Sequence, residues 1–283
     1  MSQNIYISSL AFNNKSPDQI VEISKENNWP IEFTSNLKFS KNLKSFYKNM
    51  QIKRSPHNYF PPAKKPFVLN LASKNNIILK KSINHCINGL KLAKFSNSPF
   101  FAAHAGFCID PHFSELGKKI DIKEDFDREF NKNIFIKSIS EILKIANNLN
   151  IKFLIENNVI PTWNMKNGKN PLLCCDSSEI IWLVNSINSS KFGILLDTAH
   201  LKVSCKTLNK NIEDEFKKIR PFVKAIHHSD NDGKTDNNMP ITKNYWFLKY
   251  LKYFKNIVHV IEVKNLNNLE IIQQINIIKK EWN

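Results

Sequence analysis

The residues best suited to chemistry gather between positions 225 and 236. His227, His228, Asp230, Asp232 and Asp236 follow an apolar run over residues 221–226. Such a run is typical of a buried strand, and a strand that ends in His and Asp can hold a divalent cation at the rim of a sheet. Because adjacent residues of a strand face opposite sides, we predict that His227 is a metal ligand and that His228 is not.

The elements that must position these residues have a regular rhythm. Apolar, β-branched segments recur, each ends in polar or ionisable residues, and segments with helical spacing lie between them. The predicted strands are residues 5–8, 30–34, 52–57, 100–104, 151–156, 192–197, 223–227 and 257–262. Helices are predicted around residues 139–149, after Asp176, over 245–254 and over 269–282. Eight strand–helix repeats in about 280 residues predict an α/β fold, a (β/α)8 TIM barrel, as a single domain over residues 1–283. A doubly wound sheet is the structural alternative, and it does not explain the pattern of the strand ends.

Ionisable side chains stand at the carboxyl ends of six predicted strands, where a barrel builds its site. They are His57, His104, Glu156, Asp197 with His200, His227 with Asp230 and Asp236, and Glu262. Each follows an apolar run, where an unpaired charge is costly, and a bound metal removes that cost. Taken alone, each has a plain alternative: a hydrogen-bonded histidine, a Glu–Lys pair or a helix cap. Together they favour a metal site, and the mixed oxygen and nitrogen donors suit Mn²⁺, Mg²⁺, Co²⁺ or Zn²⁺. His85, His112 and His259 are interpreted as structural.

Composition limits the class of protein. A hydrophobic fraction of 42% supports a substantial core. No apolar run reaches the roughly 18–20 residues that span a bilayer, and the first residues lack a secretory pattern. Five cysteines without a CxxC spacing suit reduced thiols. We therefore expect a cytoplasmic protein with no membrane partner and leave its oligomeric state open.

The net charge of +16 has two interpretations. Only three of the 41 basic residues are arginine (Arg54, Arg128 and Arg220), which leaves 41 − 3 = 38 lysines. Surfaces that bind phosphate usually favour the bidentate guanidinium. The lysine excess is therefore better explained by compositional bias on a solvated surface, with a nucleic-acid partner as the less favoured alternative.

Three motifs carry a resemblance to a known superfamily: residues 155–157 (IEN), 196–200 (LDTAH) and 227–233 (HHSDNDG), followed by Glu262. With them the chain resembles the xylose isomerase-like TIM-barrel superfamily, which includes sugar-phosphate isomerases and epimerases and the apurinic-site endonuclease family 2. In the epimerases, the resemblance implies that Glu156, Asp197, His227 and Glu262 hold the metal. It further implies that Glu156 and Glu262 move protons and that His200 contacts a substrate oxygen.

The endonuclease branch resembles the chain in other places: residues 57–59 (HNY), 67–73 (FVLNLAS) and 104–106 (HAG). That branch uses ligands matching His57, His104, His200 and Asp236 for additional zinc ions, so His57, His104 and Asp236 are candidates for further metal or substrate contacts. It ends the seventh-strand motif with Asp-x-His, whereas this chain has Asp236-Asn237-Asn238.

Two functional hypotheses follow. The first is a metal-dependent sugar or sugar-phosphate isomerase/epimerase of carbohydrate metabolism, with proton transfer through a metal-stabilised enediolate. Tyr59, Trp163 and Lys234 would form its substrate wall. The alternative is a metal-dependent apurinic-site endonuclease, a phosphodiesterase acting on DNA. We favour the isomerase, because Asn238 and the scarcity of arginine weaken the nuclease hypothesis.

Overall fold

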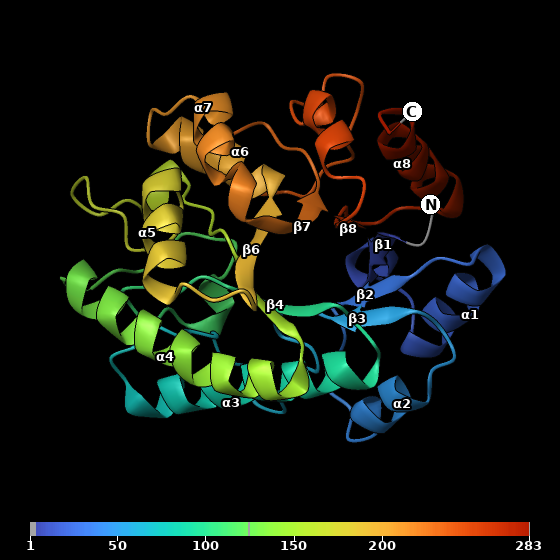
Figure 1. Cartoon of the computed structure of the whole chain (residues 1–283), viewed down its shortest axis with the longest axis horizontal. Helices are drawn as coiled ribbons and strands as arrows, with labels where there is room; N and C mark the ends of the chain where they lie inside the picture. Colours follow the sequence, from blue (N-terminus) through green and yellow to red (C-terminus); the bar gives the residue numbers. More distant parts are fainter. Residues whose placement is uncertain (1–3, 124, 283) are drawn as a thin grey trace.

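Eight parallel strands form a nearly closed barrel surrounded by helices in the computed structural model, which describes residues 4–123 and 125–282 (Figure 1). The predicted domain limits at residues 1 and 283 lie outside the described residues. The strands are β1 (Ile5–Ser8), β2 (Ile31–Phe33), β3 (Arg54–Pro56), β4 (Phe100–His104), β5 (Lys152–Glu156), β6 (Phe192–Asp197), β7 (Val223–His228) and β8 (Val258–Ile261). Their hydrogen-bonded order is β3-β2-β1-β8-β7-β6-β5-β4. The predicted (β/α)8 barrel is therefore confirmed.

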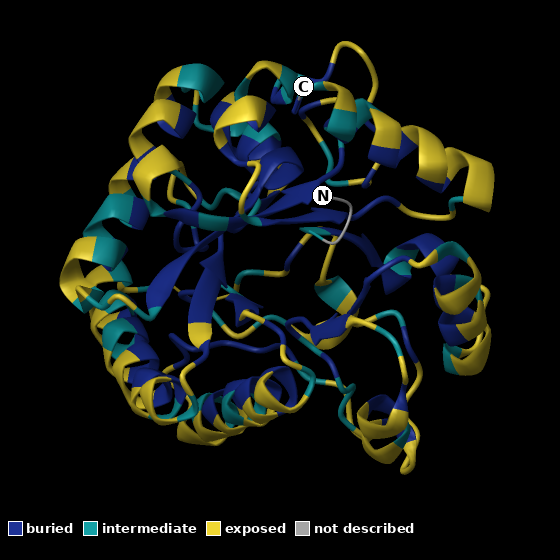
Figure 2. Cartoon of the chain, turned by 45° about the vertical axis from the view of Figure 1, so that its right-hand side comes forward, coloured by how far each residue is buried: buried dark blue, intermediate teal, exposed yellow. Residues whose placement is uncertain are grey.

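The outer layer consists of helices that show exposed residues to solvent and buried residues to the sheet (Figure 2). The α-helices are α1 (Pro17–Asn27), α2 (Leu43–Asn49), α3 (Asn76–Phe95), α4 (Arg128–Leu149), α5 (Ser177–Ile187), α6 (Thr198–Thr207), α7 (Ile212–Ile219) and α8 (Asn268–Lys280). Short 3-10 helices are η2 (Ser9–Phe12), η3 (Phe113–Glu115), η4 (Thr162–Asn164), η5 (Arg220–Phe222) and η6 (Leu248–Tyr253). No helix in the described ranges combines the length and the apolarity that crossing a membrane requires.

Side-chain caps explain where several helices begin. Asp176 precedes α5 and accepts the backbone N–H of Glu179, as the sequence predicts for a helix start. Asp197 caps α6 in the same way by accepting the N–H of His200 through Oδ1. Asp197 is also the last residue of β6. Its Oδ1 caps the helix, and its second oxygen, Oδ2, is left to face the site.

The two faces of the strands pack into different cores. One small cluster fills the barrel interior and consists of Tyr6, Phe100, Ala102, Leu154, Leu195, Ala225, Val258 and Val260. The alternate positions, such as Phe101, Phe153 and Ile194, belong to the larger core between the sheet and the helices. This alternation fixes which strand-end residues face the barrel axis.

One predicted element is wrong. The apolar spacing of residues 245–254 predicts a helix, but these residues form turns followed by the 3-10 helix η6. Phe247, Leu251 and Phe254 pack into the outer core, and Tyr245 directs its hydroxyl to His228. Tertiary packing therefore determines the backbone here, rather than helical periodicity.

Candidate metal centre

The predicted site residues meet at the carboxyl end of the barrel because they continue the interior face of their strands. His104 lies two residues after Ala102, Glu156 two after Leu154, Asp197 two after Leu195, His227 two after Ala225, and Glu262 two after Val260. The first residue of each pair belongs to the interior core. Residues two apart in a strand face the same side, so the second residue of each pair also faces the barrel interior. The register agrees, since His104 pairs with Glu156 and Asp197 pairs with His227.

Four of these residues form one candidate ligand group. Ligand atoms of Glu156, Asp197, His227 and Glu262 all lie within 4.8 Å of one another. His227 Nδ1 lies 2.9 Å from Glu262 Oε2 and 3.5 Å from Glu156 Oε1. Asp197 and His227 are completely buried. Three carboxylates and one imidazole from β5, β6, β7 and the end of β8 are a donor set suited to a divalent cation.

A second group shares Glu156 with the first. His57 Nε2 and His104 Nε2 lie 3.1 and 3.2 Å from Glu156 Oε2, and the three residues form a further candidate ligand group. The two oxygens of Glu156 therefore face different groups: Oε1 faces His227, and Oε2 faces His57 and His104. Glu156 therefore belongs to both candidate ligand groups.

His200 and Asp236 form a pair at the rim. His200 Nε2 lies 3.1 Å from Asp236 Oδ2, and its Nδ1 lies 2.8 Å from the carbonyl oxygen of Asn157. Asn238, the neutral end of the motif, is buried and lines the same cavity. Among the described residues, neither His200 nor Asp236 belongs to a group of three close ligands.

The electrostatics of the site are dominated by burial and by opposite charges. Burial lowers the pKa of His227, but Glu262, Glu32 and Glu156 outweigh burial and hold that pKa well above its ordinary value. Burial raises the pKa of Glu156, but His104, His227 and His57 hold it well below its usual range. Burial and the carboxylates Asp236, Glu156 and Glu262 raise the pKa of Asp197 to about 7 despite the opposing effect of His200. Asp197 is therefore the carboxylate of this group that a cation or a proton would stabilise most.

Unsatisfied buried atoms test whether a metal fits. Glu156 Oε2, Asp197 Oδ2, His57 Nδ1 and Asp236 Oδ1 are buried without a hydrogen-bond partner among the described residues. Leaving a buried polar atom unpaired costs about 1–3 kcal/mol, and more for a charge. Glu156 and Asp197 belong to the same ligand group, and their unpaired oxygens are accounted for by a bound cation, so the residues present fit a divalent metal.

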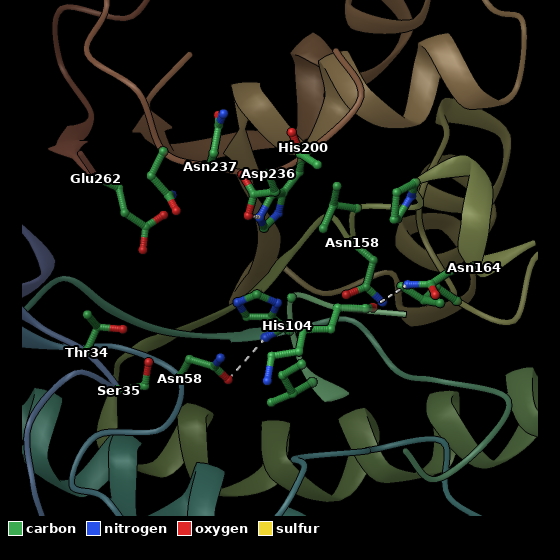
Figure 3. A pocket seen from close by; sticks show the side chains of 18 of the residues that line it. Thr34, Ser35, Asn58, His104, Asn158, Asn164, His200, Asp236, Asn237 and Glu262 are labelled. Atoms are coloured by element: carbon green, nitrogen blue, oxygen red, sulfur yellow. Dashed lines mark hydrogen bonds and ion pairs between the residues drawn. The ribbon is translucent and has the colours of Figure 1, made fainter. Parts of the chain in front are cut away.

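A cavity of about 560 Å³ opens above the ligand groups. Glu262, Asp236, His200 and His104 point toward this space from different elements (Figure 3). Glu156, Asp197 and His227 lie behind them and do not line the cavity. Of the predicted substrate wall, Tyr59 and Trp163 line the cavity. Lys234 does not line it; its side chain is exposed on the turn where its backbone N–H donates to Asp232 Oδ1.

One side of the cavity is an apolar wall made by the loops after β4 and β5. The loops bind each other: Asn164 accepts the N–H of Ile120 and donates to the carbonyl of Lys118, and Cys108 donates to the carbonyl of Pro171. The apolar wall consists of Phe107, Leu116, Ile120, Pro161, Trp163 and Leu172. A small core of its own, including Phe107, Ile120 and Leu172, supports it from below.

His228 faces away from the site. Its Nδ1 lies 3.0 Å from the Tyr245 hydroxyl and its Nε2 lies 2.8 Å from His259 Nδ1. Burial lowers the pKa of His228 well below its ordinary value, with His259 and His227 adding to the effect. This placement agrees with its prediction as a non-ligand and with the structural interpretation of His259.

One residue of the site, Glu32, was not predicted from the sequence. This carboxylate lies on β2, is completely buried, and forms a third candidate group with His57 and His227. Its signal was present, because a charged residue stands inside a predicted apolar strand. The predicted ligands came from strand ends alone, so a position inside a strand was passed over.

Comparisons with known proteins found relatives in sequence and in fold. Two curated proteins named "Probable endonuclease 4" are similar in sequence. The one from Mesomycoplasma hyopneumoniae (strain 7448) is 24% identical over 219 residues, which cover 74% of this chain and 67% of the relative. The one from Aquifex aeolicus (strain VF5) is 27% identical over 191 residues, which cover 64% of this chain and 60% of the relative. The match therefore leaves about a third or more of each relative outside it.

Solved structures share the fold. A D-tagatose 3-epimerase-like protein superposes with a TM-score of 0.72 at 21% identity, covering 98% of this chain and 96% of that one. The D-psicose 3-epimerase of Clostridium cellulolyticum H10, solved with D-tagatose, has a TM-score of 0.62 at 12% identity, covering 99% and 95%. A Thermus thermophilus protein soaked with ZnCl₂ has a TM-score of 0.67 at 13% identity, covering 98% of both chains. The family described as xylose isomerase-like TIM barrel matches residues 16–280. The chain therefore belongs to the xylose isomerase-like TIM barrel family.

Proposed function

We propose that this protein is a divalent-metal-dependent isomerase or epimerase of a sugar or sugar phosphate, and that it works in the cytoplasm. The observation that carries the proposal is the position of Glu262, which lines the cavity and also belongs to the four-residue ligand group. A carboxylate in this position can meet a substrate C–H at the point where a cation would hold the substrate oxygens. The epimerases among the structural neighbours make this class of substrate the natural first choice.

Glu156, Asp197, His227 and Glu262 would hold the cation. When bound, it supplies Lewis-acid polarisation of a carbonyl and a neighbouring hydroxyl oxygen. No cysteine contributes to the group, so the donors do not single out zinc over Mn²⁺, Mg²⁺ or Co²⁺.

Glu262 and Glu156 would move the proton. Burial raises the pKa of Glu262, but His227 outweighs burial and holds it below its usual range, so the side chain is a carboxylate that can accept a proton. Glu262 lines the cavity, so we assign proton removal to it. Proton return by Glu156, which does not line the cavity, is assigned on the resemblance to the epimerases.

His200 would stabilise the developing negative charge on the substrate oxygen. Burial lowers its pKa, but Asp197, Asp236 and Glu156 outweigh burial and hold it well above the ordinary value, which favours the imidazolium, whose positive charge would stabilise a nearby oxyanion. Trp163 and Leu116 would cover an apolar face of a small substrate, and Lys118 and Lys264 line the same cavity, where they would meet a phosphate.

A second candidate function is metal-dependent cleavage of DNA at apurinic sites. The convergence of His57 and His104 on Glu156 favours it, because two ligand groups that share a carboxylate suit a centre of more than one metal. The curated relatives named endonuclease 4 favour it as well. The neutral Asn238 beside His200 and Asp236 is the observation against it.

The deciding experiment uses the full chain loaded in turn with Mn²⁺, Mg²⁺, Co²⁺ and Zn²⁺. Each form is given a panel of aldoses, ketoses and their phosphates in D₂O, and separately a duplex with one abasic site. The proposal expects solvent deuterium at the carbon next to the carbonyl, lost by at least 100-fold in Glu262→Gln. The control Glu213→Gln changes a surface carboxylate paired with Lys249 and should keep full exchange. Nicking of the duplex without deuterium exchange into any sugar would favour the endonuclease instead.

A further inference from the structure

Glu32 is a buried carboxylate that the proposed reaction does not use. It lies at the middle of β2 on the interior face, is completely buried, and neither of its oxygens accepts an aligned hydrogen bond from a described residue. A carboxylate in such a place is costly unless a partner compensates it. Glu32 does not line the cavity above the ligand groups.

Glu32 contacts His227, one of the predicted metal ligands, through the ring nitrogen that faces away from the ligand group. His227 Nε2 lies 3.0 Å from Glu32 Oε1, whereas His227 Nδ1 faces Glu262 at 2.9 Å and Glu156 at 3.5 Å. The imidazole therefore stands between Glu32 on one side and the ligand group on the other. His227 Nε2 has no aligned hydrogen bond to a described residue, so the contact is close without being geometrically satisfied.

His57 lies close to the same carboxylate. Ligand atoms of Glu32, His57 and His227 lie within 4.8 Å of one another, and the two rings pack edge to face at a centroid distance of 4.8 Å. His57 Nε2 faces Glu156 Oε2 at 3.1 Å, and its buried Nδ1 has no hydrogen-bond partner among the described residues. Glu32 therefore contacts His227 directly and lies near His57 as well.

We propose that Glu32 is a positioning residue that fixes the tautomer and the orientation of His227, and through the same carboxylate supports His57. Carboxylates stand at both nitrogens of His227: Glu32 beside Nε2 and Glu262 beside Nδ1. A neutral imidazole has one N–H and one lone pair. When a cation takes the Nδ1 lone pair, the remaining proton would stay on Nε2, where Glu32 can hold it. A carboxylate behind a histidine ligand fixes its ring and raises its basicity, and losing such a partner typically weakens metal affinity 10–100-fold. The inference rests on the metal centre of the proposed function but not on its reaction.

The test measures metal binding rather than turnover. Metal-free full-length protein is titrated with Co²⁺ against a competing chelator, the visible d–d spectrum is recorded, and bound metal at saturation is counted by elemental analysis. Glu32→Gln keeps the shape of the side chain and removes its charge. The proposal expects Co²⁺ affinity to fall about 10–100-fold with an unchanged metal count at saturation.

The matched control is Glu215→Gln. Glu215 is also a buried carboxylate, but it lies on α7 and accepts the backbone N–H of Ser177. It should lower the unfolding temperature and leave Co²⁺ affinity unchanged. A Glu32→Gln variant that loses stability but binds Co²⁺ like the parent overturns the proposal and leaves the proposed function intact. A metal count that falls by one at saturation overturns it as well, because Glu32 would then be a direct ligand. Weaker Co²⁺ binding in a protein that acts on no sugar supports the role of Glu32 and removes the isomerase reaction.

Discussion

His200 Nε2 lies 3.1 Å from Asp236 Oδ2 and joins helix α6 to the loop that follows β7. The other nitrogen of the ring contacts the carbonyl oxygen of Asn157 at 2.8 Å. The pair stands at the rim of the cavity beside Asn238, outside the ligand groups found among the described residues. Two ligand-type side chains are thus in place here, and a neutral amide, Asn238, stands two residues after Asp236.

Asn238→His is expected to add a metal site at this position. Imidazole is a far better ligand for zinc than a carboxamide. The backbone at position 238 has a positive φ of 49°, which His, like Asn, adopts more readily than most residues. Elemental analysis at saturating Zn²⁺ should show one more ion per chain than the parent. Asn237→His, which changes the adjacent cavity residue, is the control. Equal zinc counts in all three proteins would contradict this prediction.

Removal of metal is expected to destabilise the protein. Four buried carboxylates (Glu32, Glu156, Asp197 and Glu262) share one end of the barrel, and a bound cation reduces their mutual repulsion. A cation that binds only the folded state stabilises it by about 2.7 kcal/mol at 100 times its Kd. The unfolding temperature should be higher with added Mn²⁺ or Zn²⁺ than with EDTA. In Asp197→Asn this difference in unfolding temperature should nearly vanish. A difference as large as that of the parent would show that Asp197 is no ligand.

His228→Phe is expected to lower stability without affecting metal binding. The change removes the buried partner of His259 Nδ1 and one of the two partners of the Tyr245 hydroxyl, which keeps Thr198, at a cost of about 1–3 kcal/mol. Denaturant unfolding measures the stability, and a Co²⁺ titration measures the affinity. His227→Phe, the adjacent residue on the opposite face, should abolish tight Co²⁺ binding. If the two variants bind Co²⁺ equally, the division of the two histidines between the faces is wrong.

Asp176 gives the pH prediction. Burial raises its pKa, but hydrogen bonds from Lys210, Ser178 and the backbone of Glu179 outweigh burial and hold it below the ordinary value. Its ionised form therefore stabilises the folded state above the unfolded pKa of about 3.9, and this contribution is lost as the pH falls through the lower folded pKa. Asp176→Ala should lower the free energy of unfolding by about 0.5–2 kcal/mol at pH 7 through the lost cap.

Thermal unfolding between pH 7 and pH 3 tests the sign of this effect. The difference between the parent and Asp176→Ala should shrink as the pH approaches 3. Asp176→Asn, which keeps a capping oxygen, should lie between them at pH 7. A difference that grows toward acid pH would contradict the cause given for the shift.

The fold was predictable because each strand carries its own signal. The segments 5–8, 100–104 and 192–197 are strands with the predicted limits, since an apolar run followed by a polar residue marks where each strand leaves the core. Glu156, Asp197, His227 and Glu262 were expected to converge because each stands at the carboxyl end of a predicted strand, and the resemblance to the epimerases implied that these four form one ligand set. The charge of Glu32 inside an apolar strand was a signal, but its position beneath His227 depends on how β2 lies against the other strands.

The parts that were not predictable depend on contacts between distant segments. The loops after β4 and β5 form the wall of the cavity because Asn164 bonds the backbone at Lys118 and Ile120, more than 40 residues earlier. No local pattern encodes this pairing. The misassigned helix at 245–254 has the same cause. The hydrogen bond between the Tyr245 hydroxyl and His228, on β7, places Tyr245, and a helical repeat does not.

The barrel has one seam, and the second ligand group lies across it. The hydrogen-bonded order of the sheet ends at β3 on one side and β4 on the other, and a backbone bond of 2.8 Å from the Asn58 N–H to the Ala102 carbonyl oxygen crosses between them. His57 follows β3, His104 ends β4, and both reach the same oxygen of Glu156. A metal ion held by His57, His104 and Glu156 would connect the β3 side of the sheet to the β4 side. Metal binding would therefore also stabilise the closed barrel.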